Sequence, residues 1–279
     1  MTKVAIVTGA NKGIGLSIVK GLCKKFEGDV YLTARDVGRG QKAVEELKKQ
    51  GLSPKFHQLD ITNSKSIDIL KDYLLANYGG LDLLVNNAGI SFKRADTTPY
   101  IEQVPITMNT NYHGPMAVCD KLFPLLRPGA RVVHIGGFSG QRTFHKLPEN
   151  LQKKALEIDS VQGLTGFMQR FVDDVTHGQD KQNGWPSSIG YSITKLGLIL
   201  CAPLQQLAMD KGRPGSDIVI NTACPGAVKT DMSSHSGHLT PDEGAETPLY
   251  LALLPRGTKS PRGCFCKDKA ICNWTEAVV

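Results

Sequence analysis

The sequence lacks any apolar run that approaches the roughly 18 residues of a membrane-spanning helix. The first residues lead directly into the strand-like run Val4–Val7, without the charged region, apolar region and small-residue cleavage site of a secretory leader. Apolar residues make up 41% of the chain and charged residues 21%, values typical of a globular protein with a buried core. We therefore expect a soluble cytoplasmic protein that does not bind a membrane.

The cysteines lack the spacing of a metal site. The seven cysteines form an odd set, and Cys264-Phe265-Cys266 is a C-x-C sequence with no second cluster to complete a zinc site. His235 and His238 follow Asp231 at a spacing too loose for a set of metal ligands. We expect no metal, and free thiols in a reducing compartment.

Positive charge is in excess but is not concentrated. The formal net charge is +7 and the pI is about 9.0, yet the lysines and arginines are scattered over many segments. An anionic cofactor or substrate explains the excess more simply than a nucleic acid, so we expect no nucleic-acid partner. The chain also lacks internal repeats, low-complexity segments and linker-like boundaries, and we expect residues 1–279 to form a single domain.

Short β-rich runs alternate with longer amphipathic stretches along the chain. Such alternation predicts right-handed crossovers and an α/β architecture with a doubly wound parallel sheet, the Rossmann fold. The expected strands are Val4–Val7, Val30–Leu32, Phe56–Leu59, Leu81–Val85, Arg131–Ile135 and Ile218–Thr222, and the expected helices are Ile14–Phe26, Gly40–Gln50, Ser64–Tyr78 and Ile193–Lys211.

One region departs from this alternation. Residues from about 141 to 186 are polar and charge-rich, with helical periodicity and no clear strand. A structureless loop of that length is uncommon inside a compact domain. We therefore predict a helical insertion.

A glycine-rich turn follows the first expected strand. The sequence Thr8-Gly9-Ala10-Asn11-Lys12-Gly13-Ile14-Gly15 places glycines at 9, 13 and 15, just before an apolar helix. Glycines permit a tight turn and a close approach of the backbone, and the N-terminus of the helix then faces a pyrophosphate. The spacing G-x-x-x-G-x-G differs from the commoner G-x-G-x-x-G. The context of strand and helix nevertheless predicts a dinucleotide site.

The end of the second expected strand carries an arginine. Arg35 stands where many NAD enzymes have the carboxylate that binds the ribose hydroxyls, and an arginine there favours a 2′-phosphate. Lys12 and Arg39 are candidates to add positive charge to the same pocket, and Asp36 is expected to point to solvent. We therefore predict NADPH as the cofactor in preference to NADH.

Tyr191 and Lys195 lie four residues apart in Tyr191-Ser192-Ile193-Thr194-Lys195. On a helix these positions share a face, so the ammonium lies beside the phenol and biases its proton equilibrium. Reversible proton donation near neutral pH needs a drop of roughly three units from a tyrosine pKa near 10, or about 4 kcal/mol. An isolated pair of this kind is usually a solvated helix face. Beside a cofactor turn, the pair predicts a proton donor.

With these motifs together, the chain resembles the short-chain dehydrogenase/reductase family over essentially its full length. Within that family it is most similar to the monomeric, NADPH-dependent carbonyl reductases, a group that includes proteins like 20β-hydroxysteroid dehydrogenase. Segments such as Leu32–Val37, Gly184–Ser188 and Glu243–Pro248 carry this closer similarity. The resemblance also implies that the insertion covers the helix face through which relatives assemble, and hence a monomer.

The resemblance implies roles for further residues. Asp60 and Ile61 would lie near the adenine, and Asn111 would hold a water relay to Lys195. The turn Asn87-Ala88-Gly89 would line the cofactor. The segment after Cys224 would contact the nicotinamide carboxamide. The implied cofactor-binding residues are Gly9, Asn11, Lys12, Gly13, Ile14, Gly15, Arg35, Arg39, Asp60, Ile61, Asn87, Ala88, Gly89, Tyr191, Lys195, Pro225, Gly226, Val228, Thr230, Asp231 and Met232.

The implied reaction is transfer of a hydride from NADPH to the carbonyl carbon of a ketone, a quinone or a steroid, with Tyr191 as proton donor and Lys195 and Asn111 as relay. One expected residue is missing. Gly137 stands where the family has the serine that donates a hydrogen bond to the substrate carbonyl, and the nearest hydroxyl belongs to Ser139.

The missing donor leaves three alternatives open. Ser139 replaces it, Tyr191 acts alone in a slower enzyme, or the protein binds NADPH without meaningful turnover and acts through interactions. Loss of one donor to a developing oxyanion typically costs on the order of 10²–10³ in rate. From the sequence we expect reduced but real activity, with Tyr191, Lys195, Asn111 and Ser139 as the catalytic set.

Overall fold

A computed structural model describes residues 1–93 and 95–276. Within these residues the strands form an eight-stranded sheet of order β3-β2-β1-β4-β5-β6-β7-β8, parallel except for the last pair. The chain order reverses between β1 and β4, as in a doubly wound sheet. The strands are β1 (Val4–Val7), β2 (Asp29–Ala34), β3 (Lys55–Gln58), β4 (Leu81–Asn86), β5 (Leu126–Ile135), β6 (Val219–Cys224), β7 (Phe265–Lys267) and β8 (Ala270–Ile271).

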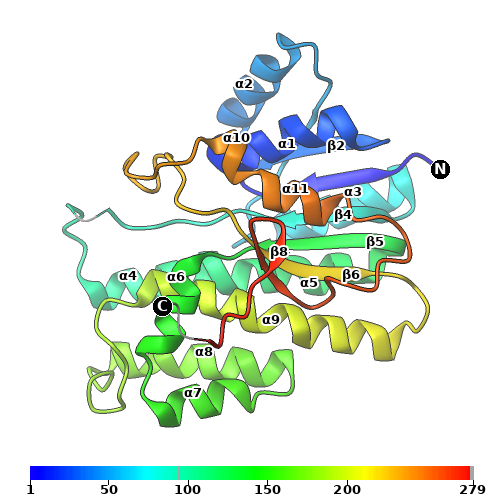
Figure 1. Ribbon diagram of the computed structural model, residues 1–279. Coiled ribbons are helices and arrows are strands. Elements are labelled where there is room, and N and C mark those ends of the chain that lie inside the picture. Colours follow the sequence, from blue (N-terminus) through cyan, green and yellow to red (C-terminus); the bar gives the residue numbers. More distant parts are fainter. Residues whose placement is uncertain (94, 277–279) are drawn as a thin grey trace.

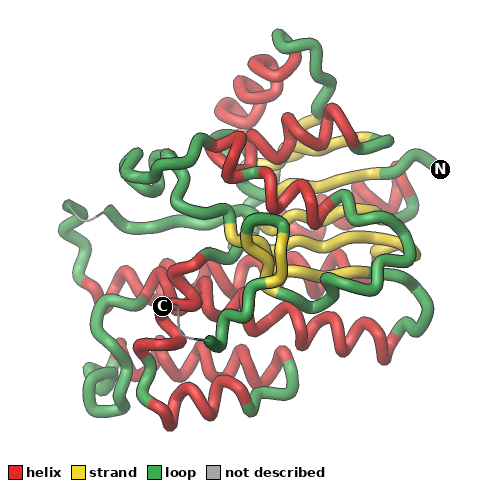
Figure 2. Tube along the Cα trace, viewed as in Figure 1, coloured by secondary structure: helices red, strands yellow, loops and turns green. Residues whose placement is uncertain are grey.

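Helices cover both faces of the sheet (Figures 1 and 2). Residues of α1, α2 and α11 pack with one face, and residues of α3, α5 and α9 pack with the other. The helices are α1 (Gly13–Lys25), α2 (Val37–Lys48), α3 (Ser64–Tyr78), α4 (Tyr100–Met108), α5 (Gly114–Leu122), α6 (Phe138–Lys146), α7 (Glu149–Leu156), α8 (Val161–Thr176), α9 (Gly190–Gly212), α10 (Pro241–Gly244) and α11 (Glu246–Ala252), with a π turn η1 (Asn109–His113) and a 3-10 turn η2 (Phe123–Leu125).

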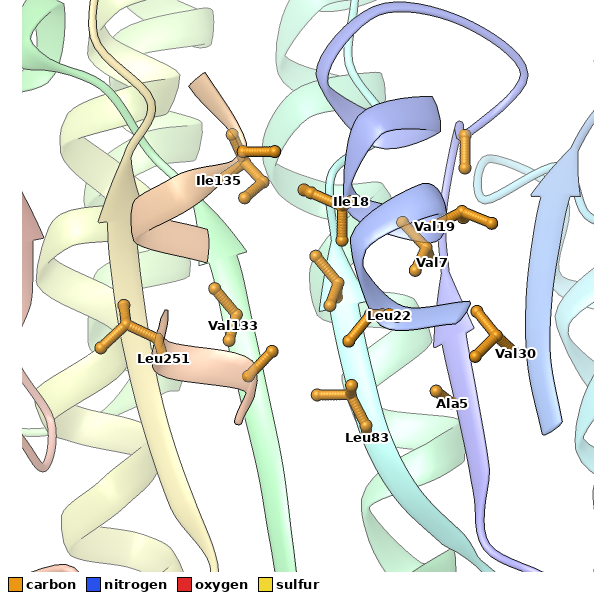
Figure 3. Packing of buried hydrophobic residues seen from close by; sticks show 14 of the residues in the cluster. Ala5, Val7, Ile18, Val19, Leu22, Val30, Leu83, Val133, Ile135 and Leu251 are labelled. Carbon is orange, nitrogen blue, oxygen red and sulfur yellow. The ribbon is translucent and has the colours of Figure 1, made fainter. Parts of the chain in front are cut away.

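The core explains why the central strands read as continuous apolar runs. All four residues of β1 are buried, because helices lie on both of its faces. Figure 3 shows Val7 and Ala5 of β1 beside Val19 and Leu22 of α1. Burying apolar surface at about 25 cal/mol per Å² is the main stabilising contribution here. The sequence prediction of an α/β doubly wound sheet is confirmed.

The helices α6, α7 and α8 lie between β5 and α9 in the chain, where the sequence predicts a helical insertion. The helix α8 packs on α4 and α9, so α7 and α8 lie outside the layer that covers the sheet (Figure 1). Met168 contacts the site of Gly197 on α9 so closely that a Cβ there would lie 2.9 Å from its Cε. The buried Trp185 donates a hydrogen bond of 2.7 Å to Asp174. These contacts hold the insertion against the central helices.

The helix α9 is more apolar than the sequence pattern indicated. It is long enough and apolar enough to cross a membrane. However, 72% of an apolar 18-residue stretch of it is buried inside the fold. Its residues pack against β6 on one side and α6 and α8 on the other. It is therefore the central core helix of the protein.

The elements differ from the sequence expectations at the edges. The strand β5 begins at Leu126 rather than Arg131, because its first part contains Pro128 and Gly129, which break the apolar pattern. The short strands β7 and β8 were not expected, and β8 is antiparallel. The helix α6 begins at Phe138, ahead of the expected start of the insertion near 141.

A neutral histidine is buried in the middle of the sheet. His134 on β5 is fully buried, donates from Nε2 to Gln205 Oε1 at 2.8 Å, and accepts at Nδ1 from Asn86 Nδ2 at 3.3 Å. Burial lowers the pKa of His134 from 6.5 to about 4, and the hydrogen bond to Gln205 acts in the opposite direction. His134 is therefore a packing residue of the core.

We predict that His134 makes the protein sensitive to acid. The unfolded chain takes up a proton near pH 6.5 and the folded protein only near pH 4, so stability falls as the pH drops through this window, by roughly 3 kcal/mol. Urea unfolding at pH 7.0, 6.0, 5.0 and 4.5 measures the loss. His134→Gln replaces the imidazole with an amide that does not titrate, and it should flatten this part of the curve whatever its effect at pH 7. Parallel curves for parent and variant would contradict the assignment.

Candidate functional site

The expected site residues gather at the carboxyl ends of the central strands. The segments that follow β4 and β6 project from the same edge of the molecule, at the left of Figure 1. This edge contains the point between β1 and β4 where the strand order reverses, the usual place for a ligand in such sheets.

The glycine turn after β1 is held by the end of β4. Gly9 has φ +61°, and a Cβ on it would lie 2.7 Å from Ala88 Cα, so no other residue fits this turn without displacement. Asn87 Nδ2 donates to the carbonyls of Thr8 and Gly9 at 2.9 and 3.0 Å. A Cβ on Gly15 would in turn meet the Asn87 amide.

Thr8 is a site residue that the sequence analysis did not predict, and its hydroxyl makes the contacts. Its Oγ1 accepts from the backbone N–H groups of Asn87 and Ala88, both at 3.0 Å. Its place directly after the first strand was the available signal. Thr8 joins the glycine turn to the segment that is expected to line the cofactor.

The helix α1 presents an uncapped N-terminus to the same edge. It begins after Lys12, whose side chain makes no capping hydrogen bond, and its first turn contains no acidic residue. Free backbone N–H groups and the helix dipole favour a phosphate at such a position. Asn11, Gly13 and Ile14 stand at this helix start, so the residues fit a dinucleotide pyrophosphate.

Lys12 is directed across the cleft. Its Nζ pairs with Asp231 Oδ2 at 2.7 Å, and His235 Nε2 lies 3.2 Å from the other oxygen of Asp231. The carboxylate of Asp231 thus holds Lys12 toward the segment after β6, and a contribution of Lys12 to the charge beside Arg35 stays a prediction. In residues 1–93 and 95–276, no group of three or more His, Cys, Asp or Glu side chains is placed to hold a metal ion.

Arg35 is exposed at the end of β2, as the sequence prediction requires. The Asp36 side chain is 44% exposed, and it also caps α2. Its Oδ1 accepts from the Arg39 N–H at 2.8 Å, and its Oδ2 lies 3.2 Å from the Arg39 guanidinium. These bonds lower the pKa of Asp36. Arg39 is therefore held by Asp36, whereas Arg35 extends into solvent beside the cleft.

Asp60 and Ile61 follow β3 near the same edge. Asp60 Oδ1 accepts from the N–H and the hydroxyl of Thr62 at 2.9 and 2.7 Å, which orders the turn before α3. Ile61 is buried, and a Cβ on Gly114 would lie 2.8 Å from its Cδ1. A contact of either residue with adenine stays a prediction.

Tyr191 and Lys195 lie on the first turns of α9. Lys195 is buried, its Nζ donates to the Ile135 carbonyl at 2.8 Å, and it lies 5.6 Å from the centroid of the Tyr191 ring. Burial lowers the pKa of Lys195 to about 8 and raises that of Tyr191 to about 12. The Tyr191 hydroxyl lies 3.7 Å from Met232 Sδ. The helix thus places a protonated phenol beside a buried ammonium.

Asn111 lies in the π turn between α4 and α5, an irregularity often found at functional sites. Its side chain is buried and makes two bonds of 2.8 Å to the backbone of Ile90, accepting from the N–H and donating to the carbonyl. The segment after β4 is therefore tied to the π turn. A water relay from Asn111 to Lys195 stays a prediction.

Gly137 and Ser139 lie at the start of α6, directly after β5. A Cβ on Gly137 would lie 3.5 Å from Ser139 Oγ and 4.0 Å from Lys195 Cγ. The position therefore has room for a side chain. The Ser139 hydroxyl lies beside the place that a serine at 137 would occupy.

The segment after β6 folds over the glycine turn. Gly226 has φ +78°, and a Cβ on it would lie 2.6 Å from Leu239 Cδ1. Val228 forms a β-bridge with Leu239, and Thr230 lies beside Gly13, with its Cγ2 3.4 Å from a Cβ placed there. Pro225, Asp231 and Met232 belong to the same fold of the chain, which brings this expected contact segment next to the glycine turn.

Comparison with known proteins identifies the family. The family model described as short chain dehydrogenase matches residues 3–149. Carbonyl reductase [NADPH] 1 of Macaca fascicularis is 48% identical over 273 residues, which cover 98% of each chain. The chain belongs to the short-chain dehydrogenase family. The human protein of the same name is 48% identical over 272 residues, 97% of this chain and 98% of the relative.

Solved structures agree with this placement. Salutaridine reductase from Papaver somniferum superposes on this short-chain dehydrogenase with a TM-score of 0.84 at 29% identity, over 94% of this chain and 99% of that one. Menthone neomenthol reductase from Mentha piperita gives a TM-score of 0.78 at 27% identity, over 96% and 99%. Both likenesses extend over nearly the whole chain, including the segments around the site.

We predict that Lys195→Met stabilises the protein in the absence of cofactor. The ammonium of an unfolded chain titrates near 10.5 and that of the buried Lys195 near 8, so burial of the charge costs roughly 3 kcal/mol at pH 7, and stability rises with pH between these values. The unpaired Ile135 carbonyl offsets part of the gain, and we expect a net increase of about 1–2 kcal/mol.

Thermal unfolding at pH 7 measures this increase as a rise of a few degrees in Tm. Lys211→Met, on an exposed position of the same helix, is the control and should leave Tm nearly unchanged. A lower Tm for Lys195→Met, or an unchanged slope of stability between pH 8 and 10, would show that the buried ammonium is not destabilising.

Proposed function

We propose that this protein reduces carbonyl groups of small molecules to alcohols with NADPH. The observation that carries the proposal is the protonated Tyr191 beside the buried Lys195, at the edge of the sheet that also presents the glycine turn and the uncapped α1. The relatives named carbonyl reductase [NADPH] 1 support both the reaction and the cofactor. Ketones and quinones are the proposed substrates, with steroids as a further class.

The cofactor supplies a hydride from C4 of its nicotinamide to the carbonyl carbon. The protein must then deliver a proton to the carbonyl oxygen. The high pKa of Tyr191 keeps the phenol protonated at neutral pH, the form that a reductase needs. The positive charge of Lys195 stabilises the phenolate that Tyr191 becomes after it donates its proton. The Ile135 carbonyl holds the lysine in place.

The backbone and the basic residues account for the binding of the dinucleotide. The N–H groups at the start of α1 bind the pyrophosphate, and the close contact of Gly9 with Ala88 lets the backbone approach it. Arg35 binds the 2′-phosphate, since the carboxylate of Asp36 is occupied by Arg39. This assignment favours NADPH over NADH.

We propose that Ser139 supplies the hydrogen bond to the substrate carbonyl that a serine at position 137 would give. Its Oγ lies beside the open position of Gly137 at the start of α6, on the same side as Lys195. The catalytic set is then Tyr191, Lys195, Asn111 and Ser139. The alternative of an interaction protein without turnover has no observation in its favour.

We propose that the protein is a monomer and that it lies in the cytoplasm. The helix α8 packs on α4 and α9, the helices through which members of this fold family are expected to assemble, and so covers that surface. Sedimentation at micromolar concentration tests the oligomeric state. No metal, membrane or nucleic acid has a part in the proposed reaction.

We predict that the protein oxidises NADPH in the presence of menadione and that Tyr191→Phe lowers kcat/KM by about 10²–10⁴, because the proton donor is lost. NADPH binding, measured by fluorescence, should be almost unchanged in the variant. NADH should be a poor substitute in both proteins. Tight NADPH binding without turnover by the parent, even at high enzyme concentration, would overturn the proposal and favour an interaction role.

We predict that Ser139→Ala lowers kcat/KM for menadione by on the order of 10²-fold, the cost of one donor to a developing oxyanion. Gly137→Ser fits the open position, so the double variant Gly137→Ser/Ser139→Ala should recover most of the loss. Ser192→Ala, which removes a hydroxyl that bonds Thr143 at 2.6 Å, is the control. If Ser139→Ala keeps full activity, the hydroxyl is not the donor. If Gly137→Ser alone raises activity strongly, the parent lacks one.

A further inference from the structure

Two cations contact the aromatic ring of Phe138, the residue that follows Gly137. The guanidinium carbon of Arg142 on α6 lies 4.8 Å from the centroid of the Phe138 ring, and Nζ of Lys267 on β7 lies 5.4 Å from it. Phe138 is partly exposed and Arg142 is exposed, so both are accessible to a ligand. Neither cation was assigned to the cofactor or to proton transfer.

This group adjoins the reacting centre. Phe138 directly follows Gly137, whose open position lies beside Ser139 and Lys195. Lys267 is the register partner of Cys224 at the end of β6. Burial raises the pKa of Cys224, and the Phe138 N–H and the Lys267 charge act in the opposite direction.

The charge balance of this group is positive. The nearest carboxylate to Lys267 is its neighbour Asp268, at 3.7 Å and with a side chain that is 80% exposed. Lys12, by contrast, is held by Asp231. Arg142 and Lys267 are the two cations in contact with the Phe138 ring.

We propose that the preferred substrates are carbonyl compounds that carry a carboxylate, with Arg142 and Lys267 binding the carboxylate and Phe138 packing against the body of the molecule. This inference rests on the proposed function and names its substrate class. An arginine offers a planar pair of donors to a carboxylate, and a lysine adds a point charge. Each cation is held by cation–π contact with the same ring, so little ordering of either side chain is needed when the anion binds.

The test compares each acid with its own methyl ester. The pairs are 4-formylbenzoate and 4-benzoylbenzoate with the corresponding esters, and the measured quantity is the ratio of kcat/KM for acid over ester. Arg142→Gln and Lys267→Gln should each lower this ratio about fivefold, and the double variant about twentyfold, the scale of partly exposed ion pairs. Division by the parent ratio cancels the different reactivity of acid and ester.

Matched controls separate this effect from net charge. Lys211→Gln/Lys259→Gln removes two exposed cations elsewhere and should leave the ratio unchanged. Turnover of neutral menadione should stay within about twofold in every variant. The parent ratio should also fall as salt is raised to about 0.3 M, because partly exposed charges are screened. A double variant with the parent ratio for both pairs overturns the inference and leaves the proposed function intact.

A binding measurement decides the inference even if turnover is absent. The alcohol product 4-(hydroxymethyl)benzoate is titrated calorimetrically into the protein with NADP⁺, beside its methyl ester. We expect the parent to bind the acid more tightly than the ester and the double variant to lose this preference. Equal affinities of acid and ester for the parent would reject the carboxylate site.

Discussion

The buried ammonium of Lys195 is the interaction on which the rest of the site depends. Its Nζ donates to the carbonyl of Ile135, the last residue of β5, and so joins the core helix α9 to the middle of the sheet. The backbone of the same lysine lies against Gly140, where a Cβ would come within 2.6 Å of its carbonyl carbon. The side chain and the backbone of this one residue thus join α9, α6 and the end of β5, and with them position Tyr191, Ser139 and the open position at Gly137. A charge is retained in a buried place at a cost in stability because it acts on the phenol beside it.

The sequence predicted the sheet and the polar residues at its edge because both follow from local rules. A run such as Val4–Val7 before a glycine turn has few alternatives in an alternating chain, and Tyr191 and Lys195 are related by helix periodicity alone. The pairing of Lys12 with Asp231 joins residues from opposite ends of the chain, so no local pattern reports it. The same holds for β7 and β8, which are too short to show a period, and for the hydroxyl of Thr8, whose partners directly follow β4. The capping role of Asp36 was not predicted, because its partner, the Arg39 N–H, is a backbone group that a reading of charges alone overlooks.

The two glycines after β5, Gly136 and Gly137, differ in whether the fold requires a glycine at their position. A Cβ on Gly136 would lie 2.5 Å from Thr222 Cγ2 on the neighbouring strand, so this glycine is required by packing. Gly137 has an extended φ of 165° and open space around its Cα, so neither packing nor backbone conformation demands a glycine there. Since the fold does not require Gly137 and it lies beside the proposed reacting centre, we attribute this glycine to the shape of the substrate. With Phe138 directly after it, the open position widens the cleft on the side where Arg142 and Lys267 stand.

At β5, the stability of the fold and the proposed reaction favour opposite protonation states of Lys195. His134 on β5 is stable only when neutral, and Lys195, bonded to the end of that strand, would also be cheapest to bury when neutral. Both groups therefore favour higher pH for the folded state, whereas proton donation by Tyr191 needs the lysine charged. A ligand that offers Lys195 a second acceptor lowers the cost of the charge and binds only the folded protein, so it stabilises the fold in the state that reacts.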